Sequence, residues 1–153
     1  MDRLNVLIDE FWIWTKLPKD QWGCADICKL QVPSTEFPKI GEICDVCTSL
    51  INLPLIPEEI NLFLMGMAID SEDEDILDRC KNVANEAFLN KLLATGVSHS
   101  QSEARWQLAE LLRRDFSQRD YYLNLLIADS NEYVRKRAKN VMSDLMQKRN
   151  GLS

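Results

Sequence analysis

The chain has 153 residues, of which 46% are apolar and 27% charged, and its formal net charge is −6. This composition argues against a disordered chain, and the length is expected to give one domain with a core that needs no disulfide or metal. The acidic balance disfavours a general nucleic-acid binder, which usually carries an excess of basic charge. Gly and Pro number five each, and so few breakers favour long helices over a sheet.

The N-terminal stretch MDRLNVLIDEFWIW contains acids and has no long apolar run, so we expect no signal peptide. No segment approaches the roughly 20 apolar residues that span a bilayer, so we expect no contact with a membrane. The chain has five cysteines, an odd number. We interpret them as reduced thiols and expect a cytoplasmic protein.

Apolar residues at steps of three and four predict a helix over 4–14. A short helix is expected over 20–30, followed by a loop over 31–41 that contains two prolines. The spacing then predicts a helix over 40–51. Another is expected over 57–69, where the proline at its first position and the two glutamates behind it suit a helix N-terminus.

From Glu74 the chain repeats itself with a period of 29 residues, because Glu103 and Glu132 open two similar segments. Six residues after each glutamate lies a small residue, and nine after it an aliphatic one: Cys80, Ala109 and Ala138, then Val83, Leu112 and Val141. Second helical runs follow over 87–94 and 121–128. Each unit is therefore predicted to be a helix–turn–helix, the pattern of an α-solenoid. Coincidental spacing among amphipathic helices is the alternative.

The stretch DSNEYVRKRAKNVM, residues 129–142, carries the sharpest local pattern: Asp129, Val134, Arg135, Ala138 and Val141. It resembles the second helix of a HEAT repeat, a unit of armadillo-type helical proteins. The resemblance implies that the aspartate accepts hydrogen bonds at a turn and that the arginine bonds to neighbouring turns. It covers roughly residues 60–148, and the 29-residue period is shorter than the ~40–47 residues of typical HEAT arrays.

We therefore expect an all-α fold, a short HEAT-like α-solenoid of stacked antiparallel helix pairs with an atypical N-terminal cap. One domain is expected over residues 1–153. Within it, 1–56 form the cap, 57–148 the repeats and 149–153 a tail.

The inventory of catalytic residue types is small. The single histidine, His99, falls in a predicted loop and is expected to be solvated. No glycine-rich phosphate loop, nucleophile elbow or metalloprotease motif is present. We predict no catalytic residues, no enzyme activity and no cofactor.

Four cysteines have spacing compatible with a zinc site: Cys24, Cys28, Cys44 and Cys47. Cys44 and Cys47 fall on the apolar face of the helix predicted over 40–51, however, where a cysteine acts as a small hydrophobe. Core packing is favoured for them, and zinc remains the alternative.

Residues 70–78, the acidic segment, carry six acids in nine positions: Asp70, Glu72, Asp73, Glu74, Asp75 and Asp78. Some of them suit the N-terminus of the next helix. The segment as a whole predicts a docking site for a basic partner. No EF-hand spacing for calcium is present. Trp106 is either a core residue or an exposed binding anchor.

The chain is thus expected to be a stoichiometric protein-binding module. In size and charge it resembles some immunity proteins of contact-dependent and other polymorphic toxin systems, which implies a basic partner such as a cognate nuclease toxin domain. One alternative is a HEAT-like nucleic-acid-associated protein, similar to the alkylpurine DNA glycosylases of that fold, that uses the basic residues at 135–139. Another is an adaptor subunit of a larger complex.

Overall fold

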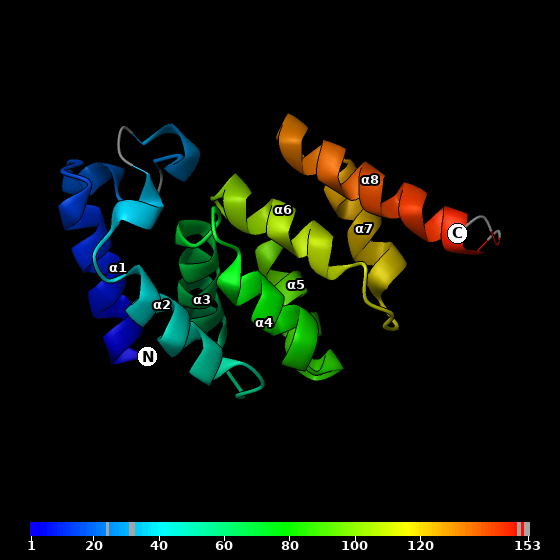
Figure 1. The fold of residues 1–153 in the computed structure, drawn as a ribbon, viewed down its shortest axis with the longest axis horizontal. Coiled ribbons are helices and arrows are strands. Elements are labelled where there is room, and N and C mark those ends of the chain that lie inside the picture. The colour runs from blue at the N-terminus through cyan, green and yellow to red at the C-terminus, as the bar shows by residue number, and fades with distance from the viewer. Residues whose placement is uncertain (24, 31–32, 150, 152–153) are drawn as a thin grey trace.

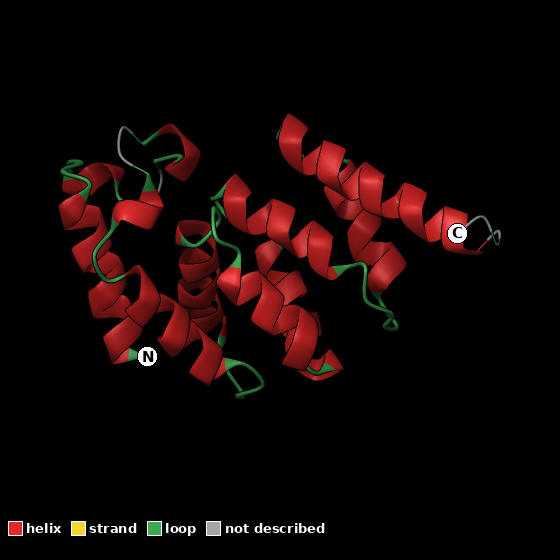
Figure 2. Ribbon diagram, viewed as in Figure 1, coloured by secondary structure: helices red, strands yellow, loops and turns green. Residues whose placement is uncertain are grey.

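The computed structural model describes residues 1–23, 25–30, 33–149 and 151, and all regular elements in that part of the chain are helical (Figure 2). The predicted all-α class is confirmed. The helices are α1 Asp2–Trp14, α2 Ile40–Leu50, α3 Pro57–Ile69, α4 Asp75–Val83, α5 Glu86–Gly96, α6 Ser102–Leu111, α7 Arg119–Ile127 and α8 Glu132–Arg149. Among these described helices, none combines the length and apolarity needed to cross a bilayer.

The helices form two layers (Figure 1). The helices α2, α4, α6 and α8 follow one another across the front, each packing on the next, while α3, α5 and α7 lie behind them. Between the layers α3 packs against α6, and α7 against α8. The N-terminus and the C-terminus lie toward opposite ends of the molecule.

The three segments predicted to repeat become α4, α6 and α8, which begin within one residue of Glu74, Glu103 and Glu132. The small residue at the sixth position is fully buried in all three helices: Cys80, Ala109 and Ala138. The ninth position is buried in the second and third units, but Val83 is exposed. Val83 is the last residue of α4, and Ala84, which follows in extended backbone, is buried instead.

The turns before α6 and α8 are each held by an arginine of the helix that follows, Arg105 and Arg135, which stand 30 residues apart and thus one position out of the 29-residue register. Arg135 donates from Nη1 to the carbonyl oxygens of Asp129 and Ser130, both at 2.8 Å. Arg105 donates from the same atom to the carbonyls of His99 and Ser100, which again lie six and five residues earlier. The Asp129 carboxylate also accepts the Asn131 N–H at 2.7 Å.

Arg105 also joins α6 to the turn before α8. Its Nε and Nη2 donate to the two carboxylate oxygens of Asp129 at 2.7 and 3.1 Å, and both side chains are about nine-tenths buried. Removing one partner of such a pair leaves an uncompensated buried charge, which costs about 3–5 kcal/mol.

The helix predicted over 20–30 is wrong. The chain there forms two short 3-10 turns, Lys19–Gln21 and Ile27–Lys29, with extended backbone at Trp22 between them. Gly23 follows with φ +72°, in the left-handed region, which ends any regular helix. A third 3-10 turn, Ser34–Glu36, lies in the stretch predicted as a loop.

The core runs through α3, whose residues from Phe63 to Ile69 are all buried. Gly66 allows the neighbouring helices to approach, because a Cβ atom there would lie 2.6 Å from the Cys47 Sγ atom of α2. Gly96 does the same at the end of α5, where a Cβ atom would lie 2.3 Å from the Leu108 Cδ1 atom of α6. The sequence thus places glycine at two positions where the neighbouring helix leaves no room for a Cβ atom.

Candidate functional site

The acidic segment leaves the C-terminal end of α3, forms a turn and enters the first turn of α4. Glu72, Asp73, Asp75 and Asp78 are exposed, and Glu74 is half-buried. Glu74 stands immediately before α4 with φ +60°, so the turn closes through a left-handed residue. The segment therefore presents five of its six predicted acids to the surface.

Asp70 differs from its neighbours because only 1% of its surface is exposed. Its Oδ2 atom accepts the Ile76 N–H at 2.7 Å, its backbone oxygen accepts the Glu74 N–H at 2.8 Å, and the Cys44 thiol approaches Oδ1 at 3.4 Å. Burial raises the pKa of Asp70 to about 6. Asp70 thus holds the turn together, and its carboxylate is not on the surface as the docking prediction required.

The exposed carboxylates of the segment have few partners. Asp78 pairs with Lys81 at 2.9 Å, and Glu72 accepts a hydrogen bond from the Thr35 hydroxyl at 3.0 Å. Within the described residues, the carboxylates of Asp73, Glu74 and Asp75 take part in no ion pair. Their negative charge remains available to a partner.

Trp106 is only 7% exposed. Its ring meets Tyr133 edge to face, with centroids 5.9 Å apart, and the guanidinium of Arg137 lies 4.8 Å from its centroid. These contacts join α6 to α8, whereas the acidic segment leads into α4. Trp106 therefore packs between α6 and α8. Its role as a binding anchor stays a prediction, and its burial argues against that role.

The bases of the C-terminal part are mostly engaged within the chain. Five arginines pair with carboxylates: Arg105, Arg113, Arg119, Arg137 and Arg149. Two others donate to backbone oxygens: Arg114 to those of Cys80 and Ala84 at the end of α4, and Arg135 to the turn before α8. Little of this positive charge is free to meet phosphate.

The described cysteines do not gather into one thiolate site. Cys28 lies with Asp26 and Glu103, and Cys44 with Asp70 and Asp75, each set having its possible ligand atoms within 4.8 Å of one another. Cys47 is fully buried in the core, and Cys24 lies outside the described residues.

The thiols are also poor nucleophiles. Burial, reinforced by hydrogen bonds to carboxylates, raises the pKa of Cys28 to about 12. Burial likewise raises the pKa of Cys80 to about 12, and it also raises the pKa of Cys44. A thiol with such a pKa stays protonated at neutral pH, and the thiolate is the form that ligates metals or attacks substrates.

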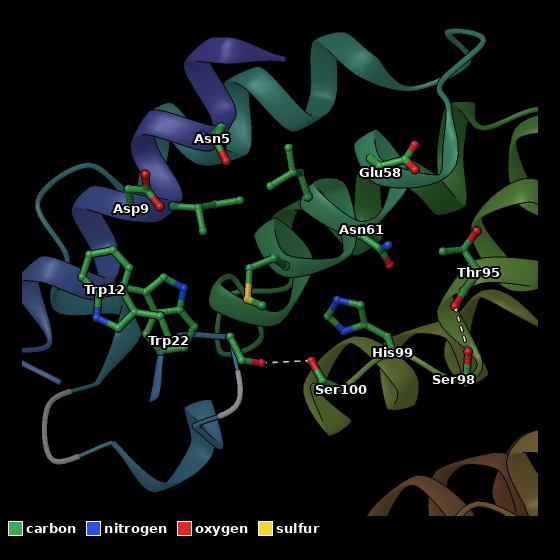
Figure 3. Close-up of a pocket in the computed structure, with 14 residues that line it drawn as sticks. Asn5, Asp9, Trp12, Trp22, Glu58, Asn61, Thr95, Ser98, His99 and Ser100 are labelled. Atoms are coloured by element: carbon green, nitrogen blue, oxygen red, sulfur yellow. Dashed lines mark hydrogen bonds between the residues drawn. The ribbon is translucent and has the colours of Figure 1, made fainter. Parts of the chain in front are cut away.

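A cleft that the sequence did not reveal lies between α1, α3 and the connection from α5 to α6 (Figure 3). Its volume is about 630 Å³. Apolar side chains, Ile8, Trp12, Leu62 and Met65, line part of it. Its charged lining side chains are two acids, Asp9 of α1 and Glu58 of α3, which Figure 3 shows on opposite sides of the opening.

Trp22 forms one wall of this cleft, and it is positioned from the other half of the chain. The Gln101 side-chain amide donates to the carbonyl oxygens of Gly23 and Ala25 at 3.0 and 2.8 Å, and its oxygen accepts the Ile27 N–H at 3.3 Å. The Ser100 hydroxyl donates to the Gly23 oxygen as well (Figure 3). These bonds fasten the segment after Trp22 onto the turn before α6.

His99 lines the cleft but is 9% exposed, so the predicted solvated histidine is wrong. Its Nδ1 atom accepts the Gln101 N–H at 3.2 Å, and Arg105 bonds to its carbonyl oxygen. Burial lowers the pKa of His99, and the nearby Arg105 charge lowers it further. The imidazole is therefore neutral at pH 7 and acts as part of the turn.

The chain matches no protein-family model, no curated protein and no solved structure.

Proposed function

We propose that this protein is a stoichiometric protein-binding module and, within that class, a cytoplasmic immunity protein that neutralises a nuclease toxin. The observation that carries the proposal is the state of the acidic segment. Asp73, Glu74 and Asp75 are consecutive, and in the part of the chain that the structure describes they take part in no ion pair, although other acids there pair with arginines.

A basic partner suits such a surface. A nuclease binds a polyanion and carries lysine and arginine in its cleft, because those side chains neutralise phosphates. An inhibitor with unpaired carboxylates can occupy the same charges, and electrostatic attraction speeds the encounter and favours the correct partner.

The use of the arginines counts against the nucleic-acid-associated alternative. Arg135 and Arg137 lie in the basic stretch that would meet phosphate. Arg135, however, holds the turn before α8, and Arg137 pairs with Glu110 at 2.9 Å. Lys136 and Lys139 are exposed, but two lysines supply little of the charge that non-specific binding needs.

Binding without catalysis is supported by the state of the reactive side chains. The His99 imidazole is neutral and buried, with Nδ1 occupied by a backbone N–H. The raised pKa values of Cys28, Cys44 and Cys80 leave their thiols protonated.

For the fold we propose a short HEAT-like solenoid, in which α3/α4, α5/α6 and α7/α8 are successive helix pairs and the part before residue 57 is the cap. The 29-residue spacing of Glu74, Glu103 and Glu132, which stand within one residue of the starts of α4, α6 and α8, supports it. Arg105 and Arg135 also support it, because they bond in the same way to the turns before α6 and α8. An array of this kind presents an extended face to a partner.

The test compares two variants with the same loss of charge. In the segment variant, Glu72→Gln, Asp73→Asn and Asp75→Asn remove three exposed acids. In the control, Asp2→Asn, Asp20→Asn and Glu132→Gln remove three exposed acids that lie elsewhere. The purified proteins are used to capture a partner from the source cells, and the captured protein is assayed for nuclease activity.

We expect wild type and control to capture a basic nuclease and to inhibit it at equimolar ratio, and the segment variant to bind it at least about tenfold more weakly, within the range for close charge pairs. Equal binding by both variants would contradict the role of the acidic segment. A captured partner without nuclease activity would contradict the toxin assignment.

A further inference from the structure

A buried carboxylate without a base lies at the start of α6. Glu103 is the second residue of that helix, and only 4% of its surface is exposed. Within the described residues it enters no ion pair and accepts no backbone N–H. The Ser102 hydroxyl lies 3.4 Å from each of its oxygens, which is longer than the usual O–H···O bond of about 2.5–3.0 Å. A buried carboxylate ordinarily has a cation or strong donors beside it, and Glu103 lacks both.

Two further side chains of the metal-ligating kind lie against this carboxylate. Asp26 immediately precedes the 3-10 turn Ile27–Lys29, and Cys28 lies within it. With Glu103 they offer one ligand atom each, and these three atoms lie within 4.8 Å of one another. The Cys28 thiol is 3.0 Å from the Oδ1 atom of Asp26, whereas the exposed Lys29 bonds to the other oxygen, Oδ2, at 2.8 Å. One sulfur and two carboxylates thus converge on one point.

This convergence is fixed from two distant parts of the chain. Glu103 belongs to α6, and the side chain of Gln101, two residues earlier, bonds to the carbonyl oxygens of Gly23 and Ala25 and to the Ile27 N–H. Ile27 stands between Asp26 and Cys28 in the sequence, so these bonds hold both side chains beside the start of α6. A ligand set held in this way needs little reorganisation to bind an ion.

The donor atoms favour zinc over magnesium or calcium. Zinc binds thiolate sulfur at about 2.3 Å and carboxylate oxygen at about 2.0–2.2 Å in a tetrahedron, so neighbouring ligand atoms stand roughly 3–4 Å apart. The three atoms of this group lie within 4.8 Å of one another, and small side-chain movements bring them to that spacing. Magnesium and calcium take oxygen ligands and leave a sulfur atom unused.

A cation would also change the state of the thiol. Burial and hydrogen bonds to Asp26 and Glu103 raise the pKa of Cys28 to about 12, so the metal-free thiol holds its proton. A divalent ion among the three side chains reverses this electrostatic balance. On binding, the thiol releases its proton to solvent and the sulfur becomes a thiolate ligand.

The second group of this kind in the described chain, Cys44 with Asp70 and Asp75, lacks the decisive feature. Its buried carboxylate is already satisfied, because the Oδ2 atom of Asp70 accepts the Ile76 N–H at 2.7 Å. Asp75 is exposed. Cys44 therefore serves as the matched control for Cys28.

We propose that Asp26, Cys28 and Glu103 bind one zinc ion, with a water molecule as the fourth ligand. The ion fastens the segment around Cys28 to the start of α6. The set shares only Cys28 with the four-cysteine site that the sequence spacing suggested. This inference goes beyond the proposed function and does not depend on it.

The probe is Zn²⁺ alone, titrated into the reduced, metal-free, full-length protein in competition with a chromophoric chelator. We expect one equivalent to bind with a dissociation constant of about 1 μM or tighter. Co²⁺ in its place should give the charge-transfer absorption of a cobalt–thiolate bond. Zinc should also raise the midpoint of thermal unfolding, because an ion that binds only the folded state stabilises it. No binding, or a cobalt complex without thiolate absorption, would overturn the proposal.

Two variants remove one ligand each, Cys28→Ser and Glu103→Gln. We expect each to bind zinc at least about tenfold more weakly and to lose the zinc-dependent rise in unfolding midpoint. Cys28→Ser should also lose the thiolate absorption. The controls, Cys44→Ser and Glu132→Gln, should bind zinc as wild type does. Unchanged affinity in either ligand variant would overturn the site, and so would an equal loss in Cys44→Ser.

Discussion

The charged side chains are used differently in the two parts of the chain, residues 1–100 and residues 101–153. The first part has 17 acids against 8 bases, and four of those acids enter ion pairs with other described residues. The second part has 7 acids against 10 bases, and seven of those bases bond to carboxylates or to backbone oxygens of the described chain. Most bases of residues 101–153 therefore form bonds within the protein, while many acids of residues 1–100 remain exposed at the surface. Net charge alone does not show which charges a partner can reach.

The variant expected to have the largest effect on stability is Arg105→Ala, and it tests this contrast. It removes the buried pair with Asp129 and the bonds that hold the turn before α6. We expect the free energy of unfolding to fall by about 3–5 kcal/mol, measured by urea denaturation. Lys136→Ala, at an exposed base of the same region, should change it by no more than about 0.5 kcal/mol. Similar losses in the two variants would remove the distinction between engaged and available bases.

Gln101→Ala tests how the second part fastens the first. The variant loses three hydrogen bonds to the segment from Gly23 to Ile27. We expect a loss of about 2–3 kcal/mol in unfolding free energy and faster hydrogen exchange at the Ile27 amide. Because the wall of the cleft depends on this segment, the Trp22 indole signal should shift in the same variant. Unchanged exchange at Ile27 would show that the segment is held by other contacts.

Asp70 gives a pH dependence of known sign. Its pKa is about 6 in the folded protein and near 4 in an unfolded chain, so the folded state binds the proton more tightly. Stability from this residue is present below pH 4 and is lost as pH rises through 6. The difference in unfolding free energy between Asp70→Asn and wild type should therefore shift in favour of the variant by roughly 1–3 kcal/mol as the pH rises from 4 to 7. Denaturation of both proteins at the two pH values measures it. A constant difference across that range would contradict the raised pKa.

The smallest effect is expected for the segment variant. If Glu72, Asp73 and Asp75 serve a partner and not the fold, their neutralisation should change the free energy of unfolding by no more than about 0.5 kcal/mol. A gain is more natural than a loss, because the change removes repulsion between neighbouring acids. A loss of about 2 kcal/mol or more would show that these acids stabilise the turn, as Asp70 does.

The periodicity of apolar residues predicted those helices whose formation depends on their own sequence. The helices with clean three- and four-residue spacing are present, and the repeated glutamates mark the starts of α4, α6 and α8. The helix over 20–30 was wrong because the segment is held from a distance, by Gln101, and is broken by Gly23. No pattern within the segment itself records a bond to a residue more than 70 positions away.

The candidate site shows the same limit. The acidic segment is evident in the sequence, but only the structure separates buried Asp70 from its exposed neighbours, since all six acids read alike. The cleft is lined by side chains from α1, α3 and the turn before α6. Because these segments are far apart in the sequence, no local motif could predict it. His99 was misplaced for the same reason, because its burial depends on bonds to Gln101 and Arg105.

The bond between Arg105 and Asp129 also bears on how this chain could change in length. Repeat arrays commonly gain or lose whole units, because each unit contacts only its neighbours. Here α6 carries a buried cation, Arg105, whose counter-charge Asp129 lies in the turn before α8, and Trp106 of α6 packs on Tyr133 of α8. A truncation before residue 129 would leave the Arg105 charge buried without its partner. Helix α6 therefore depends on the segment that follows it, and we expect that segment not to be removable as an independent unit.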